Sequence, residues 1–281
     1  MRIIEKPILE PSLVYSKCLN SIGIRAKRDT FRKVKKYIKI KSDEYDSKAC
    51  IGDLYTIPIH NDVNGILTKD DMKKTLYTQQ MVAKPKGRAI YDKLMALAPL
   101  SKCPFCGIGQ VSTLDHYLVK SKFPTYSVLP YNLVPCCKDC NTGKGSSFTN
   151  VKDKQALHPY YDDFTDGQWL FAEVKETSPL SVGFKVNAPT NWDNISKARV
   201  EAHFIEYDLK NRFAVEATNE LAKLNNSFTL YPLKKRLRKK HLQKDFLKFK
   251  NLHLNSWESA LYQALSESDW YCGEGCKQRA I

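Results

Sequence analysis

The sequence predicts an α+β fold in which a short cysteine-rich core with strands lies between two mainly helical regions. Apolar residues recur at helical spacing before residue 98 and again after residue 193. Between them, residues 103–145 carry two Cys-x-x-Cys pairs and a predicted strand. We therefore divide the chain into a mainly helical basic region (1–98), a central core (99–160), and a β-hairpin followed by helices (161–281).

The N-terminal region is predicted to be helical and basic. Residues 25–41 hold nine basic residues and one acid, with Phe31, Val34 and Ile38 at helical spacing, which favours one helix with a buried stripe. Residues 42–66 read as irregular. Thr68 and Asp71 resemble an N-cap and its N3 partner, opening a helix to about residue 80. A further helix over residues 88–98 leads into the core.

The C-terminal region is predicted to be a hairpin followed by helices. Residues 168–175 and 181–187 have strand-like patterns and form the expected hairpin. Helical patterns follow over 194–207, 210–225 and 234–250, and the last of these holds nine basic residues. A final helix is expected to start at Asn255, with Glu258 in the capping-box position.

Charge and cysteine content narrow the class of protein. The net charge is +15, from 45 Lys and Arg against 30 Asp and Glu, which favours a polyanionic partner such as nucleic acid. The chain starts without a signal-peptide pattern and has no run long enough to span a bilayer. We therefore expect a cytoplasmic protein with no membrane association, in which clustered cysteines bind metal rather than form disulfides.

The two Cys-x-x-Cys pairs predict a structural zinc site. Cys103, Cys106, Cys137 and Cys140 supply four thiolates, the set that suits tetrahedral zinc and leaves no position for water. Cys136 is adjacent to the second pair but off its spacing. Cys272 and Cys276 form a Cys-x-x-x-Cys pattern without further ligands nearby in the sequence, so their role is left open.

Polar residues between the cysteine pairs predict a second site. Asp115 and His116 fall at the end of the predicted strand, and Asn132 lies in the loop that returns to the second pair. Asn141 follows Cys140 in the first turn of a predicted helix. Because neighbours on a helix point about 100° apart, Cys140 can face the zinc while Asn141 faces elsewhere.

This arrangement resembles the zinc-stapled, treble-clef form of the HNH (ββα-metal) endonucleases. The resemblance covers about forty residues and implies that His116 is the general base and that Asn132 orients it by a hydrogen bond. Asp115 and Asn141 would hold one divalent cation at the scissile phosphate. Many relatives have histidine at the position of Asn141, and two oxygen ligands favour Mg²⁺ or Mn²⁺. Lys120 and Lys144 are expected to contact phosphate.

The resemblance implies hydrolysis of phosphodiester bonds in nucleic acid. DNA is the default substrate, and structured RNA is the alternative because nothing in the motif excludes a 2′-hydroxyl. The layout also resembles the HNH subunits of Septu-type and retron-associated anti-phage systems, which implies an ABC-type ATPase partner. Two other readings remain: a non-catalytic zinc-stabilised nucleic-acid-binding module, and a structural subunit that binds an acidic protein.

Overall fold

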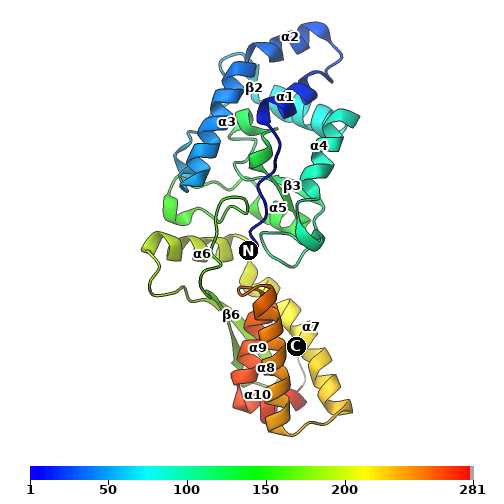
Figure 1. The fold of residues 1–281 in the computed structure, drawn as a ribbon, viewed down its shortest axis with the longest axis vertical. Coiled ribbons are helices and arrows are strands. Elements are labelled where there is room, and N and C mark those ends of the chain that lie inside the picture. Colours follow the sequence, from blue (N-terminus) through cyan, green and yellow to red (C-terminus); the bar gives the residue numbers. More distant parts are fainter. Residues whose placement is uncertain (279–281) are drawn as a thin grey trace. The chain divides into compact units, whose positions relative to one another are not determined.

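The structure is a computed structural model, and it describes residues 1–278. The chain forms two compact units, one spanning Arg2–Asp162 and the other starting at Asp163 and including Met1. The first unit therefore holds both the predicted N-terminal region and the cysteine-rich core. Figure 1 shows that helices dominate both units, with short two-stranded sheets within them.

The first unit opens with α1 (Pro11–Leu19), α2 (Arg25–Lys33) and α3 (Lys35–Cys50). The single helix expected over residues 25–41 is divided at Val34, which ends α2 and precedes α3. The irregular stretch expected from residue 42 is also wrong up to Cys50. Ser42, Tyr45 and Ala49 continue the buried stripe of α3 at helical spacing, so burial extends the helix there.

A π-helix is the main surprise in the first unit. After η1 (Leu54–Thr56) and the short strands β1 (Asp62–Val63) and β2 (Leu67–Thr68) comes the π-helix η2 (Asp71–Val82). The predicted cap is present: Thr68 Oγ1 accepts a hydrogen bond from the Asp71 amide, and the Asp71 carboxylate accepts one from the Thr68 amide.

Helix α4 (Pro85–Met95) packs closely against the π-helix. A Cβ atom on Gly87 would lie 2.2 Å from the Gln80 carbonyl oxygen, so only glycine permits this approach. The same helix contacts both strands of the central hairpin, and the Tyr91 hydroxyl accepts a hydrogen bond from the Leu114 amide. Through α4, the hydrophobic core of this unit thus packs against the central hairpin.

The cysteine-rich core is a β-hairpin followed by a helix. Strands β3 (Thr113–His116) and β4 (Leu133–Cys136) pair antiparallel, with Thr113 opposite Cys136 and His116 opposite Leu133. Helix α5 (Lys138–Lys144) follows directly and contacts β3. The remaining segments of this region are four short 3₁₀ turns: η3 (Pro99–Ser101), η4 (Pro124–Tyr126), η5 (Pro130–Asn132) and η6 (Lys152–Lys154).

The second unit is a hairpin packed on helices. Strands β5 (Leu170–Lys175) and β6 (Ser181–Val186) form the predicted antiparallel hairpin, which contacts α7 and α9. The helices are α6 (Asn194–Glu206), α7 (Leu209–Leu230), α8 (Lys235–Leu252), α9 (Trp257–Glu267) and α10 (Asp269–Gly273), followed by the 3₁₀ turn η7 (Gly275–Lys277).

The start of α9 differs from the prediction by one residue. Ser256 is the N-cap, and its side chain accepts a hydrogen bond from the Ser259 amide. Asn255 is buried, and its Oδ1 accepts hydrogen bonds from the amides of Trp169 and Leu170. Asn255 therefore ties the start of the hairpin to the helix instead of capping the helix.

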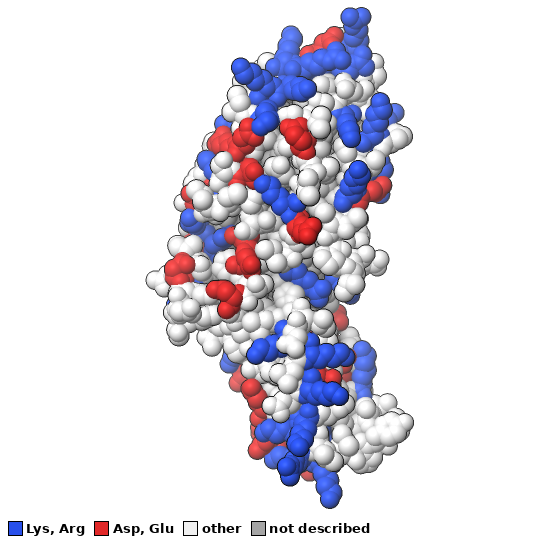
Figure 2. All heavy atoms as spheres, viewed as in Figure 1, with Lys and Arg blue, Asp and Glu red and all other residues white. Residues whose placement is uncertain are grey.

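Basic side chains lie on the surface of both units. On the face shown in Figure 2, lysine and arginine side chains gather over α2 and along α8. Arg238 is an exception on α8, because it is buried and donates hydrogen bonds to backbone carbonyls of Leu233, Cys272 and Gly273. No helix in residues 1–278 is both long enough and apolar enough to cross a membrane.

Candidate metal centre and catalytic site

The four predicted cysteines converge on one point. The Sγ atoms of Cys103, Cys106, Cys137 and Cys140 all lie within 4.8 Å of one another, and all four residues are buried. Metal–sulfur bonds of about 2.3 Å in a tetrahedron place the sulfur atoms about 3.8 Å apart. The Cys106 and Cys137 sulfur atoms are 3.8 Å apart, so the cluster has the dimensions of a structural zinc-type site.

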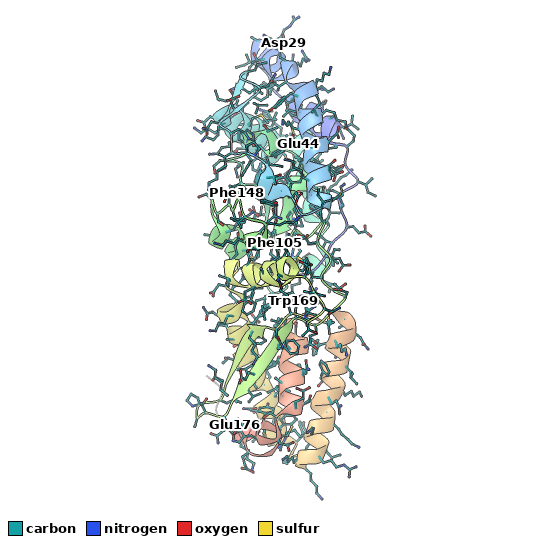
Figure 3. The ribbon with its side chains drawn as sticks, turned by 90° about the vertical axis from the view of Figure 1, so that its left-hand side faces the viewer. Asp29, Glu44, Phe105, Phe148, Trp169 and Glu176 are labelled. Atoms are coloured by element: carbon teal, nitrogen blue, oxygen red, sulfur yellow. The ribbon has the colours of Figure 1, made fainter. Side chains whose placement is uncertain are left out.

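Backbone amides surround the sulfur atoms as expected for metal-bound thiolates. The Gly109 amide donates to Cys106 Sγ, and the Cys140 amide donates to Cys137 Sγ, which also caps α5. Gly107 adopts a φ of +74°, a conformation that favours glycine in the turn after Cys106. Phe105 lies in the first knuckle and is buried (Figure 3).

Cys136 is not a member of the cluster that could hold the metal. Its thiol donates a hydrogen bond to the Cys137 carbonyl oxygen, as its off-register position implied. Cys272 and Cys276 are also outside any such cluster within residues 1–278, and their thiols donate to the carbonyls of Leu265 and Gly273.

The second predicted site lies at the end of β3. Asp115 and His116 are both buried, with 3% of each residue exposed. Successive side chains of a strand point to opposite faces, so the two residues meet different neighbours. Asp115 contacts the C-terminal end of α5, whereas His116 contacts η2 and the residue that follows η4.

One ring nitrogen of His116 is bound and the other is open. Nε2 lies 2.9 Å from the Ser127 carbonyl oxygen, which fixes it as the protonated, donating nitrogen. Nδ1 forms no hydrogen bond with the described residues, and it is not among the fully buried polar atoms that lack a partner. It is therefore accessible. The Tyr77 ring packs edge-on against the imidazole at 4.5 Å and restricts its orientation.

The environment of His116 keeps the imidazole neutral. Burial lowers the pKa of His116 well below its usual value, and the nearby positive charge of Lys120 lowers it further. Lys120 is partly buried with its Nζ 4.9 Å from the centre of the Tyr77 ring, and burial lowers the pKa of this ammonium as well. A neutral imidazole with an open Nδ1 can accept a proton.

Asn132 does not orient His116 as the resemblance implied. Its Oδ1 accepts hydrogen bonds from the Tyr45 hydroxyl and the Leu118 amide, and its Nδ2 donates to the carbonyls of Leu118 and Tyr126. These four bonds close the loop between β3 and β4. The backbone carbonyl of Ser127 takes the orienting role, so Asn132 acts on the histidine only through the loop.

Lys144 is buried and does not reach solvent as a phosphate contact would. Its Nζ donates to Asp115 Oδ2 at 2.6 Å and to the carbonyls of His116 and Tyr117, each at 2.8 Å. All three ammonium hydrogens are thereby used by the protein. The side chain turns inward along α5 to Asp115, so the expected contact between Lys144 and phosphate is not made in this conformation and stays a prediction.

Asn141 lies on α5, the helix that contacts β3. Its side chain is half-buried on α5 and makes no hydrogen bond with residues 1–278. Its backbone carbonyl accepts from Gly145, so only the amide group is available for a ligand. Within the described chain, no group of three or more His, Cys, Asp or Glu residues converges at this second site. The role of Asp115 and Asn141 as ligands of a second cation stays a prediction.

Several residues at this site carried no sequence signal. His158 Nε2 hydrogen-bonds the Tyr45 hydroxyl, and its ring packs 4.1 Å from that of Tyr117. Phe148, which is labelled in Figure 3, follows α5 and packs edge-on against Phe123 with ring centres 4.7 Å apart. These contacts join segments far apart in the chain.

Fold and site together define a mixed α and β protein built around a buried four-cysteine centre of zinc type. Comparison with known proteins aligns the chain with Protein ea31 of Escherichia phage lambda at 36% identity, covering 74% of this chain and 75% of the phage protein. The chain belongs to the same family as this phage protein. No family model matches the sequence. No solved structure matches it either.

Proposed function

We propose that the chain is an HNH endonuclease that hydrolyses nucleic-acid phosphodiester bonds. The observation that supports this most directly is His116, a buried neutral imidazole with Nε2 bound to a carbonyl and Nδ1 accessible. It lies at the end of β3, and the helix that follows the β-hairpin contains one clustered cysteine, Cys140, and is capped by another, Cys137. A general base needs this combination of fixed orientation and an unprotonated nitrogen.

In this proposal His116 Nδ1 takes the proton from the attacking water. The Ser127 carbonyl stabilises the resulting imidazolium through the Nε2–H bond and prevents rotation of the ring. The Asp115 carboxylate and the Asn141 amide supply oxygen donors, which suit Mg²⁺ or Mn²⁺. When bound, such a cation would neutralise charge on the phosphate and on the leaving oxygen. Next to His116, Lys120 is the candidate for a phosphate contact.

DNA is the substrate we propose, with structured RNA as the alternative. The net charge of +15 supports a polyanion of either kind, and backbone contacts carry little sequence information. The resemblance to HNH subunits of anti-phage systems leads us to propose a defence role beside an ABC-type ATPase. Co-purification of such an ATPase with the chain from a strain that encodes both would test that part.

A non-catalytic nucleic-acid-binding module is the second candidate. The observation that favours it is the buried ion pair between Lys144 and Asp115, because a carboxylate already neutralised by an ammonium is a weaker metal ligand. In that case zinc and the basic helices would hold nucleic acid without cutting it.

Cleavage of plasmid DNA and of total cellular RNA in Mg²⁺ separates these candidates. We expect the wild type to cut one polymer and His116→Ala to be slower by about 10²–10⁴-fold, the usual contribution of a general base. His241→Ala, which removes an exposed histidine of α8, is the matched control and should cut normally. Equal cleavage by His116→Ala would contradict the nuclease proposal. Nucleic-acid binding without cleavage by any of the proteins, with the ATPase present, would favour the binding module.

A further inference from the structure

The ammonium group of Lys144 occupies the place beside Asp115 that a bound metal cation would otherwise take. Three oxygen atoms surround Nζ: one from the Asp115 carboxylate and two from the carbonyls of His116 and Tyr117. The side chains of Lys144 and Asp115 are 5% and 4% exposed, so water screens the pair poorly. The protein thus supplies its own cation to the acidic residue of the candidate site.

The position of Lys144 on α5 makes this contact specific. Lys144 is three residues after Asn141, so both side chains project from the same face of the helix. The helix itself is anchored by Cys137 and Cys140 in the four-cysteine cluster. The four-carbon stem of lysine, however, can rotate without movement of the helix. The ammonium can therefore leave Asp115 while the backbone stays in place.

We propose that Lys144 is a positioning residue that competes with the divalent cation for Asp115 and thereby raises the cation concentration the site requires. This inference rests on the proposed metal-dependent nuclease. Two positive charges on one buried carboxylate repel each other strongly, because the surroundings are of low polarity. Binding of a cation at Asp115 then requires displacement of the ammonium toward solvent or substrate.

Direct binding of Mn²⁺ to the zinc-loaded full chain tests the competition. We expect Lys144→Met to bind Mn²⁺ about tenfold more tightly than the wild type, a typical size for coupling between two ligands. The matched control is Lys138→Met, which removes an exposed lysine from the same helix and should leave the affinity unchanged. The gain should vanish when Asp115→Asn is combined with Lys144→Met. A merely structural lysine would not produce this pattern.

A second measurement is made on the wild type and needs a variant only to assign the signal. In a spectrum of ¹⁵N-labelled lysine side chains, Lys144 should give a slowly exchanging ammonium signal, assigned by its loss in Lys144→Arg. Addition of Mg²⁺ should abolish or shift that signal. An unchanged signal at saturating Mg²⁺, or unchanged or weaker Mn²⁺ binding by Lys144→Met, would overturn the competition while cleavage by the wild type still supported the nuclease. If neither protein binds Mn²⁺, both proposals fail.

Discussion

His116 combines two properties at the residue scale that the sequence alone could not supply together: deep burial and one accessible nitrogen. Burial and, after it, the charge of Lys120 lower the pKa of His116; the hydrogen bond to Ser127 raises this pKa by less, and the charge of Lys144 lowers it. A general base works when unprotonated, so a lowered pKa extends activity to lower pH. We expect the acid limb of the pH–rate profile to lie below pH 6.5, the usual pKa of histidine.

Removal of the Lys120 charge should shift the acid limb of the pH–rate profile to higher pH. Lys120→Met takes away a positive charge that disfavours the imidazolium, so the limb should shift to higher pH. Rates of cleavage measured from pH 5 to pH 8 at saturating Mg²⁺ check both expectations. A wild-type limb above pH 6.5, or a shift to lower pH in Lys120→Met, would show that another group controls the profile.

Asn132 should be required for stability more than for chemistry. Asn132→Ala removes four buried hydrogen bonds, among them those to the amide and the carbonyl of Leu118, and we expect the free energy of unfolding to fall by about 3 kcal/mol or more. Asn141→Ala is the comparison, since its side chain bonds no described residue; stability should change by less than about 0.5 kcal/mol while cleavage is lost. Chemical denaturation measures both. Equal stabilities of the two variants would contradict a structural role of Asn132.

The fixed spacing of the cysteine pairs made the four-cysteine cluster predictable, because four thiolates at that spacing have one common use in a reduced protein. The partners of Lys144 and Asn132 were not predictable. Nothing in the sequence tells whether a lysine on a seven-residue helix turns outward to solvent or inward to Asp115. That choice depends on which segments the fold brings behind the helix.

At the scale of the elements, the sequence predicted a helix boundary where a local cap sets it. It did not predict a boundary that packing against distant residues sets. Thr68 and Asp71 cap η2 as the sequence indicated, yet nothing in the sequence marked the helix as a π-helix. The extension of α3 to Cys50 likewise follows from burial of Tyr45 against the Asn132 loop, a contact across 87 residues. Short-range patterns carry no information on such contacts.

The packing of α4 on the π-helix gives a test at this scale. Gly87→Ala places a methyl group 2.2 Å from the Gln80 carbonyl oxygen, so the two helices must separate. We expect a loss of about 2 kcal/mol or more in the free energy of unfolding. Gly143→Ala on α5 is the matched control, because a Cβ there meets no atom within 4 Å and alanine favours the helix. Thermal unfolding measures both variants. If Gly87→Ala were as stable as Gly143→Ala, the close approach of α4 to η2 would be contradicted.

The two units should differ in their dependence on zinc at the scale of the whole molecule. The four-cysteine cluster lies in the unit Arg2–Asp162, where it joins the turn after η3 to the start of α5. Structural zinc contributes about 10–16 kcal/mol of apparent binding energy in small domains, so its removal should loosen this unit first. Hydrogen exchange with and without a zinc chelator should rise throughout residues 2–162 before residues 163–278. Equal loosening of both units, or none, would contradict a structural zinc site.

The charge of the whole molecule predicts where nucleic acid is held. Lys240, Lys244 and Lys248 lie one turn apart along α8, are exposed, and have no ion-pair partner among residues 1–278. Their ammonium groups are therefore free to contact successive phosphates. Reversal of all three to glutamate should weaken DNA binding and reduce the slope of log K against log salt by about 2–3, near 0.9 per phosphate contact.

The control variant changes the net charge by the same amount, but the altered residues lie at separate places on the surface. Lys175, Lys210 and Lys223 are exposed lysines on β5 and α7 of the same unit, and their reversal also shifts the net charge by six. If overall charge alone governs binding, both triple variants lose affinity alike. If α8 is a contact surface, its reversal has the larger effect and alone reduces the salt slope, because only removed phosphate contacts stop releasing counterions.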